Sequence, residues 1–410
     1  MRFAAKGQRY WIGDRAFEGD PIAALRALLR EWRAPRLPGM PPFMGGAVGF
    51  FGYDANRYFQ RLPAHQNDDF GIWDIAFHFV NEFLVVDHHA DLIYAVATGS
   101  QFSECQSRAQ TLLHAVKRRH TMERRQAADS PPPSARSVNY ASNFEHDDYL
   151  ASVRRIQDYI RTGDTYQVNL SQRLEAEYRG HGLDLYETLS RIDPVHFASY
   201  FQFDDFEIIS ASPERLVRVD NGKVFTRPIA GTRRTGADDE NARFLHELRT
   251  CEKELSEHVM LVDLERNDLG RVCRYGSVHV TKLMEITRYA HVMHIESEVI
   301  GELDNGKDLL EVVAALFPGG TITGVPKIRT MEIIAELEPT ARGLYTGSIG
   351  YLSFTGDMDL NIAIRTILRK GPRAYIQVGG GVVIDSDPQR EFKETLNKAR
   401  SLLRALGKSH

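Results

Sequence analysis

Two pairs of glutamates, far apart along the chain, place the strongest constraint on how these 410 residues fold. Glu254 and Glu257 form the first pair, and Glu391 and Glu394 form the second. Each pair has i,i+3 spacing within an amphipathic pattern, so both of its carboxylates lie on one face of a helix. A single pair of this kind is typical of a solvated helix face. Two pairs instead suggest that two distant helices meet around a common site.

The residues around each pair predict the helix that carries it. On the second helix, Asp387 is the expected N-cap and Pro388 the first helical residue, and Lys398 shares a face with the two glutamates. Its expected apolar stripe consists of Phe392, Leu396, Ala399, Leu403 and Leu406. The first helix is expected to run without a break through a stripe made of Phe244, Leu248, Cys251, Leu255 and Val259.

Four carboxylates without Cys or His ligands nearby favour a hard cation. The three cysteines, Cys105, Cys251 and Cys273, lack C-x-x-C spacing, so neither a zinc site nor a disulfide framework is indicated. Mg²⁺ uses few carboxylates and completes its shell with water and oxygen atoms of an anionic substrate. We therefore expect a Mg²⁺ site.

The composition excludes several classes of partner. A formal net charge of −4 and a pI near 6.4 provide no field that attracts nucleic acid or an anionic membrane surface. The segment 1–14 has no apolar core, and about 18 apolar residues never run together. These features predict a soluble, unexported protein in a reducing cytoplasm.

The chain divides at a stretch that cannot build a core. Residues 130–134 read Ser-Pro-Pro-Pro-Ser, which predicts a linker over 121–143 between an N-terminal region (1–120) and a catalytic region (144–410). Strands and helices are interspersed without a regular βαβ rhythm. The expected fold class is α+β, with packed antiparallel sheets and outer helices.

Polar side chains occur within and just after expected strands. The strand 166–171 alternates, which places Gln167, Asn169 and Ser171 on one face, and by itself this pattern is typical of a solvent-facing edge. It follows an expected helix over 148–161. Glu214 follows the apolar Ile208 and Ile209, and by itself that position is typical of a surface turn.

Two segments that mix glycine, hydroxyl groups and cations suit the capture of carboxylate or phosphate. They are 227–234 (RPIAGTRR) and 317–327 (FPGGTITGVPK). The second is not a nucleotide-binding loop, because Ile328 stands where a hydroxyl residue would bind Mg²⁺. Arg365, expected to point outward from a strand, and the glycines 379–381, whose bare N–H groups can approach an anion, complete the set.

Taken together, these motifs closely resemble the chorismate-utilising enzyme family over about residue 143 to the C-terminus, and more weakly before it. The segments that carry the resemblance are 163–172 (GDTYQVNLSQ), 212–215 (SPER), 228–232 (PIAGT), 261–268 (LVDLERND) and 291–294 (HVMH). The resemblance implies the chorismate-binding fold, with antiparallel sheets packed face to face, a Mg²⁺ between the glutamate helices, and chorismate as substrate.

The family's roles transfer by motif to positions of this chain. Glu257 and Glu394 are implied as direct metal ligands, with Glu254 and Glu391 holding metal-bound waters. Glu214 is implied as the general acid for the leaving hydroxyl, and His294 lies beside the ring. The implied catalytic set consists of Glu214, His294, Gln167, Ala230 and Thr232. The groups implied to bind the substrate carboxylates are Thr321, Tyr345, Arg365, Lys398 and the amides of Gly379 and Gly381.

Two positions indicate which branch of the family is closest. Isochorismate and salicylate synthases carry a lysine base at the position of Gln167, and a neutral amide cannot activate water, so ammonia is the expected nucleophile. Many aminodeoxychorismate synthases carry a nucleophilic lysine where this chain has Ala230, as anthranilate synthases do. A covalent route is therefore excluded, and an intermediate aminated at carbon 2 is expected.

Other segments favour the aminodeoxychorismate branch, in the pathway to para-aminobenzoate and folate. These are 317–324, 347–354 and the triple glycine, together with the lack of a Leu-Leu-Glu-Ser feedback motif in the N-terminal region. Segment 291–294 favours anthranilate synthase, which is the alternative. A chorismate-binding scaffold without turnover is a third. Since no cysteine lies in a glutaminase elbow, the resemblance implies that a separate glutamine amidotransferase subunit supplies ammonia.

Overall fold

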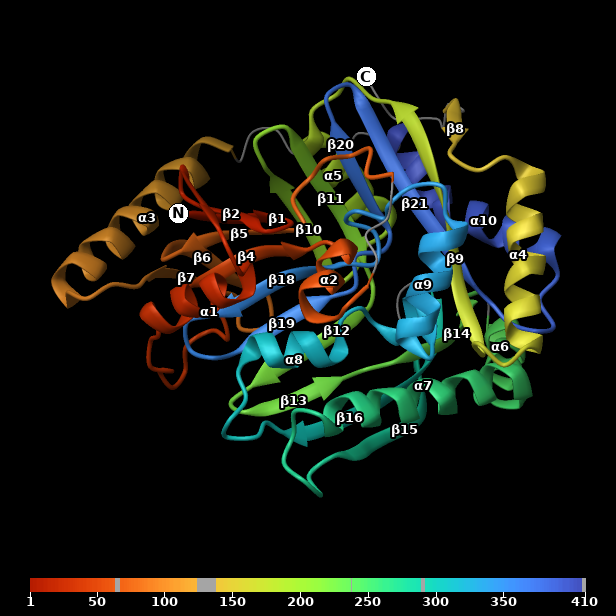
Figure 1. The fold of residues 1–410 in the computed structure, drawn as a ribbon. Helices are drawn as coiled ribbons and strands as arrows, with labels where there is room; N and C mark the ends of the chain where they lie inside the picture. Colours follow the sequence, from red (N-terminus) through yellow and green to blue (C-terminus); the bar gives the residue numbers. More distant parts are fainter. Residues whose placement is uncertain (63–66, 124–137, 237, 289–291, 408–410) are drawn as a thin grey trace.

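The chain folds around two large antiparallel sheets that pack face to face (Figure 1). The computed structural model describes residues 1–62, 67–123, 138–236, 238–288 and 292–407. Within these ranges one sheet has twelve strands in the order β14-β16-β13-β12-β19-β18-β4-β5-β1-β2-β3, with β15 beside β16. The second has seven strands in the order β10-β11-β20-β21-β9-β17, with β8 beside β9, and β6 and β7 form a separate pair.

The elements have the following bounds. The strands are β1 (Arg2–Lys6), β2 (Arg9–Ile12), β3 (Arg15–Glu18), β4 (Gly46–Phe51), β5 (Ile75–Val80), β6 (Glu82–Asp87), β7 (Leu92–Ala97), β8 (Tyr140–Ser142), β9 (Gln167–Glu177), β10 (Phe197–Gln202), β11 (Phe206–Ser212), β12 (Arg215–Asp220), β13 (Lys223–Thr226), β14 (Ile229–Arg234), β15 (His279–Arg288), β16 (Val292–Glu302), β17 (Gly324–Val325), β18 (Ser348–Ser353), β19 (Met358–Asn361), β20 (Thr366–Lys370) and β21 (Arg373–Val382). The helices are α1 (Pro21–Glu31), η1 (Tyr53–Ala55), α2 (Asn56–Phe59), α3 (Phe102–Glu123), α4 (His146–Arg161), α5 (Gly182–Ile192), α6 (Asp238–Thr250), α7 (Glu252–Gly270), α8 (Leu309–Leu316), η2 (Gly320–Ile322), α9 (Lys327–Leu337) and α10 (Pro388–Leu406).

Apolar side chains fill one part of the space between the sheets, and helices cover the outer faces. Phe50 of β4 packs edge-on against Phe206 of β11, with ring centroids 6.1 Å apart. Helices α5 and α10 cover the outer face of the seven-stranded sheet, and α1 and α8 cover that of the twelve-stranded sheet. The expected α+β class with face-to-face antiparallel sheets and outer helices is confirmed. No helix in the described ranges is long and apolar enough to cross a membrane.

The two regions expected on either side of the linker contribute to the same sheet. Strand β4 pairs along its length with β18, from Ser348 opposite Phe51 to Ser353 opposite Gly46. Part of the expected linker has regular structure, because β8 pairs with β9. Residues 124–137, which include the proline run, lie outside the described residues.

Two of the three expected helices are confirmed, and the third is divided. Helix α4 ends before Gly163, which has φ +83°, and α10 begins at Pro388 with Asp387 accepting the Arg390 N–H. However, α10 also buries Glu391, so its buried face extends beyond the predicted stripe. The predicted single helix through the first glutamate pair is wrong, because α6 ends at Thr250 and α7 begins at Glu252. The predicted stripe residue Val259 is 53 % exposed as a result.

Two neighbouring connections carry the chain from one sheet to the other. Residues 213–214 join β11 of the seven-stranded sheet to β12 of the twelve-stranded sheet, and residues 362–365 join β19 to β20. The Ile362 N–H donates to the Glu214 carbonyl at 3.0 Å, and the Ala211 N–H donates to the Arg365 carbonyl at 3.0 Å. Glu214 and Arg365 are thereby fixed where both sheets meet.

A buried ion pair ties these parts together. The side chains of Arg342 and Glu338 are 1 % and 2 % exposed, and the guanidinium donates to both carboxylate oxygens, at 2.9 and 2.7 Å. It also donates to the carbonyls of Ile322 at 3.0 Å and Asn169 at 2.6 Å. Glu338 in turn accepts the Ser171 N–H at 2.8 Å. This pair therefore joins α9, β9 and η2.

We expect Arg342→Met to lower the free energy of unfolding by about 3–5 kcal/mol, because the Glu338 carboxylate would be left buried without its cation. Urea denaturation measures the change. Arg161→Met is the matched control, since the Arg161–Asp158 pair is 58 % and 56 % exposed and should contribute less than about 1 kcal/mol. Equal losses in the two variants would contradict the central role of the buried pair.

Candidate active site

The inner face of strand β9 carries the first group of site residues. Gln167, Asn169 and Ser171 are 3 %, 6 % and 1 % exposed. The interpretation of this face as a solvent-facing edge is therefore wrong, because helices α7 and α9 supply partners that cover it. Gln167 donates to Glu257 of α7 at 3.2 Å, and Ser171 donates to Glu338 at the end of α9 at 2.8 Å.

The glycines of β21 give these side chains room. Gly379 lies opposite Ser171 and Gly381 opposite Asn169 in the antiparallel register. A Cβ at Gly379 would lie 2.5 Å from Asn169 Oδ1 and 2.8 Å from the Tyr345 hydroxyl, and one at Gly381 would lie 2.4 Å from Gln167 Nε2. Side chains at these two positions would collide with the polar groups of the site, so both positions require glycine.

Glu214 is a buried carboxyl in the connection between the sheets. It is 9 % exposed, so its interpretation as a surface-turn residue is wrong. Burial raises the pKa of Glu214 to about 7, although the Thr321 hydroxyl, which donates at 3.0 Å, and the positive charge of Lys398 oppose the rise. At neutral pH a substantial fraction of Glu214 therefore holds a proton that it can donate.

Arg365 and His294 bring a cation and an imidazole to the same region. Arg365 was expected within a strand, but it precedes β20 in a left-handed conformation with φ +50°. Among the side chains that the structure describes, its guanidinium pairs with Asp193 at 3.5 Å. Burial lowers the pKa of His294, and the Arg365 charge lowers it further, while Glu296 and a hydrogen bond to the Gly231 backbone oppose the shift. His294 is consequently a neutral imidazole near neutral pH.

Strand β14 carries Ala230 and Thr232, two residues that the family motifs imply to be catalytic. Ala230 is 8 % exposed and lies opposite Ile295 of β16, and Thr232 lies opposite His294. The side chain of Thr232 lies outside those the structure describes, as does His291 of the 291–294 motif.

The first glutamate pair faces β9 and β14 from α7. Glu257 accepts from Gln167, and Glu254 Oε1 accepts from Arg233 at 2.8 Å. The other carboxylate oxygen, Glu254 Oε2, is buried and accepts no hydrogen bond from a described group. A Cβ at residue 231 would lie 2.9 Å from Glu254 Oε2, which is too close. Gly231 also has a φ of +60°, a conformation that favours glycine.

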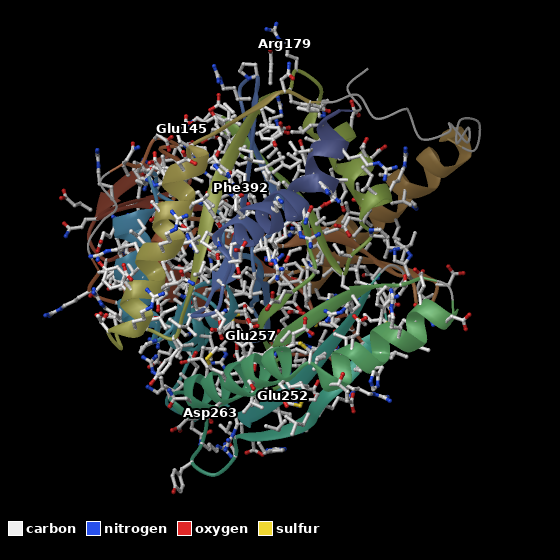
Figure 2. All side chains as sticks on the ribbon, turned by 90° about the vertical axis from the view of Figure 1, so that its right-hand side faces the viewer. Glu145, Arg179, Glu252, Glu257, Asp263 and Phe392 are labelled. Atoms are coloured by element: carbon white, nitrogen blue, oxygen red, sulfur yellow. The ribbon has the colours of Figure 1, made fainter. Side chains whose placement is uncertain are left out.

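The second glutamate pair faces β21 from α10. Glu391 accepts the Ser386 hydroxyl at 2.7 Å, and Glu394 pairs with Lys398 at 2.9 Å. Lys398 also donates to the Gly379 carbonyl at 3.0 Å. A Cβ at Gly380 would lie 3.1 Å from Glu391 Oε2 and 3.8 Å from Glu394 Oε1. Figure 2 shows Glu257 of α7 below Phe392 of α10.

Glu257 of the first pair contacts Gln167, and Glu391 and Glu394 of the second pair lie near Gly380, whereas Glu254 lies beside Gly231 and Arg233. Within the described ranges no three Asp, Glu, His or Cys side chains lie close enough to hold a metal ion together. Mg²⁺ takes only one or two carboxylates and fills its shell with water and substrate oxygens. The oxygen-only donor set and the unpartnered Glu254 Oε2 fit such an ion, and Mg²⁺ stays a prediction.

Several residues that position the site were not singled out from the sequence. Arg342 and Glu338 have the i,i+4 spacing of an ion pair, which could have indicated them. Gln377 alternates with Gly379 and Gly381 on β21, and this period of two could have placed it on the same face. Glu265 lies inside a recognised motif, and burial raises its pKa to about 8.

Comparisons with known proteins agree with this geometry. A family model described as chorismate binding enzyme matches residues 3–404. The chain is 42 % identical over 401 residues to "Anthranilate synthase component 1" of Acetivibrio thermocellus, covering 96 % of this chain and 81 % of the relative. It is 44 % identical over 399 residues to "Aminodeoxychorismate synthase component 1" of Bacillus subtilis (strain 168), covering 95 % and 83 %.

A solved structure shares the fold over nearly the whole chain. The crystal structure of anthranilate synthase component I from Streptococcus pneumoniae TIGR4 superposes with a TM-score of 0.87 at 35 % identity, covering 98 % of this chain and 89 % of that one. Relatives with both names match almost equally well, so identity does not separate the two activities. The chain belongs to the chorismate-binding enzyme family, as an enzyme of the anthranilate and aminodeoxychorismate synthase component I type.

Proposed function

We propose that the chain is the aminating component I of an aminodeoxychorismate synthase, which converts chorismate and ammonia into 4-amino-4-deoxychorismate and water. The observation that supports amination is the presence of two groups in one site. Glu214 is a buried carboxyl that holds a proton near neutral pH, and Gln167 is a neutral amide. An amide cannot remove a proton from water, whereas ammonia needs no base in order to attack.

Charge complementarity supports chorismate as the substrate. Chorismate carries two carboxylates, and Arg365 and Lys398 are the cations of the site, while the Tyr345 hydroxyl lies beside Gly379. These donors would fix the ring in one register. A bound Mg²⁺ held by Glu257 and Glu394, with Glu254 and Glu391 behind its waters, would draw electron density from the ring through its carboxylate.

The leaving hydroxyl determines the role of Glu214. Hydroxide is a poor leaving group, so Glu214 would give it a proton as the carbon–oxygen bond at carbon 4 breaks, and water departs. Ammonia would add at carbon 2 in the space beside Ala230, giving a 2-amino intermediate. A second ammonia would then bond to carbon 4 and expel the first. A glutamine amidotransferase subunit would supply the ammonia.

The choice of product rests on the resemblance of segments 317–324 and 347–354 to aminodeoxychorismate synthase. Anthranilate synthase is the second candidate, favoured by Ala230 and by the motif that contains His294. In that reaction the 2-amino intermediate loses its ring proton and pyruvate. A non-catalytic scaffold is disfavoured, since a scaffold has no use for a buried carboxyl that retains its proton.

Glu214→Gln should retain affinity for chorismate but lose about a hundredfold or more in turnover, because the amide cannot protonate the leaving group. In the parent chain, turnover should fall as the pH rises through about 7, where Glu214 loses its proton. Asp54→Asn removes another buried carboxyl with a raised pKa and should leave this pH limb in place. A loss of chorismate affinity without a loss of rate would contradict the acid role.

Turnover should require Mg²⁺. Glu257→Gln and Glu394→Gln each delete one ligand charge at constant volume, so both should remove most turnover without changing the thermal midpoint. Glu252→Gln, on the exposed side of α7, is the matched control and should titrate with Mg²⁺ like the parent. Near-normal rates at limiting Mg²⁺ in either site variant would disprove the metal assignment.

With ammonium salt and chorismate, the main product should be 4-amino-4-deoxychorismate, and pyruvate should appear only after a separate lyase is added. Chromatography of the product and a pyruvate assay measure this directly. Stoichiometric pyruvate with anthranilate fluorescence, in the absence of a lyase, would replace the first candidate with the second.

A further inference from the structure

Glu265 is a buried carboxyl that the proposed reaction leaves without a role. It lies on α7, about two helical turns after Glu257, and is 8 % exposed. A carboxylate in such a place is unfavourable unless cations or hydrogen-bond donors compensate for the water it has lost. Burial raises the pKa of Glu265 to about 8, so near neutral pH most of this side chain holds a proton.

The charged groups that act on Glu265 oppose one another. The ammonium of Lys327 on α9 lowers the pKa of Glu265, whereas the carboxylates of Asp268 and Glu214 raise it. Lys327 is itself bound to Asp268 at 2.5 Å and to the Leu316 carbonyl at 2.8 Å. Because this cation is already paired, it does not remove the proton from Glu265.

The hydroxyl of Thr226 meets this carboxyl from the twelve-stranded sheet. Thr226 is the last residue of β13 and is 1 % exposed, and its side chain lies beside Glu265. Thr226 Oγ1 and Glu265 Oε2 are both buried, and neither makes a full hydrogen bond with a described group. Buried polar atoms without partners are unfavourable, and a water molecule bonded to both would satisfy them.

Two contacts place this region next to Glu214. On the side of the sheet, β13 pairs with β12, which begins directly after Glu214. On the side of the helix, Leu264 of α7 occupies the space that a Cβ of Gly320 in η2 would need. Thr321, the next residue of η2, donates its hydroxyl to Glu214 at 3.0 Å. The charge of Glu214 accordingly acts on Glu265.

Glu214 needs a new proton in every cycle of the proposed reaction. Its proton departs with the leaving hydroxyl as water, and Glu214 is left as a buried anion, 9 % exposed. Lys398, the cation that acts on it, is engaged with Glu394 and with the Gly379 carbonyl. A proton that returns from within the protein does not have to pass the bound ring.

We propose that Glu265 and Thr226 return a proton to Glu214 after each turnover. The Glu265 carboxyl gives its proton, through the Thr226 hydroxyl and a water bonded to it, to the Glu214 carboxylate, and the Glu265 anion then takes a proton from solvent. The nitrogen that has bonded to the ring releases one proton to solvent, so the cycle neither gains nor loses protons. The relay rests on the proposed acid role of Glu214, and it applies to either candidate product.

The test compares the first turnover with the steady state in the whole chain, with chorismate, Mg²⁺ and an ammonium salt. Below pH 7 Glu214 begins with its proton, so Glu265→Gln should consume the first chorismate in each site at the parent rate. Later turnovers wait for a proton, so the ratio of the first-turnover rate to the steady-state rate should rise about tenfold or more. Rapid-quench measurement of chorismate loss gives both rates. The steady state of the variant should be slower still in heavy water, an effect that slow product release would not have.

A matched pair of variants at one position tests the hydroxyl. Thr226→Val keeps the shape of the side chain without its hydroxyl and should raise the ratio as Glu265→Gln does, whereas Thr226→Ser keeps the hydroxyl and should behave like the parent. Asp54→Asn is the control for loss of a buried carboxyl. Burial raises the pKa of Asp54 to about 6, and the charge that acts on it most is that of Arg57, so its replacement should leave the ratio unchanged. If Glu265→Gln does not fold, the two Thr226 variants decide the test.

The outcomes separate the relay from the function. An unchanged ratio in a folded Glu265→Gln or Thr226→Val variant that consumes chorismate would overturn the relay and leave the proposed function standing. The relay is also overturned if the first turnover slows as much as the steady state, since Glu265 would then only support the structure, or if Thr226→Ser behaves like Thr226→Val. A parent chain that consumes no chorismate with ammonium salt would overturn both.

Discussion

The architecture of the active site depends on the buried Arg342–Glu338 pair. An isolated charge in this interior would be very unfavourable, and each partner is stabilised by the other and by hydrogen bonds with the backbone and with the hydroxyls of Ser171 and Thr346. Those backbone partners belong to β9 and η2, and the hydroxyl of Thr321 on η2 is the donor to Glu214. Through these backbone contacts the ion pair therefore helps to position both Glu214 and the polar face of β9.

The site also depends on where the chain changes sheets. The connections 213–214 and 362–365 are joined by a backbone hydrogen bond from Ile362 to Glu214, which holds the backbones of Glu214 and Arg365 in neighbouring positions. A residue in such a connection can be buried without belonging to a regular strand. Burial in this connection raises the pKa of Glu214 to about 7, and the connection also allows Arg365 a left-handed backbone that a strand would not allow.

The sequence predicted the features that local patterns control, and it failed where partners from distant elements decide. Helix α10 follows from Asp387 and Pro388, and the fold class from the irregular order of strands and helices. The break at Cys251 was missed because the apolar spacing continues across it. From the sequence the inner face of β9 resembles a solvated edge, because the groups that contact Gln167 and Ser171 lie on α7 and at the end of α9, about 90 and 170 residues later. No period along one strand contains that information.

A polar inner face also explains why two activities share this scaffold. Between the sheets, the apolar contact around Phe50 and Phe206 holds the fold together, whereas the stretch from Arg173 to Gln167 holds polar side chains whose hydrogen bonds are incompletely satisfied. In the proposed reaction the substrate, leaving group and nucleophile are all polar, so they would supply hydrogen bonds to this stretch. The product would then depend on whether a second ammonia reaches carbon 4 of the aminated ring or a base first removes the ring proton. Since Ala230 is a small residue that fits either proposed reaction, groups that line the approach to the ring are where we expect the two activities to differ.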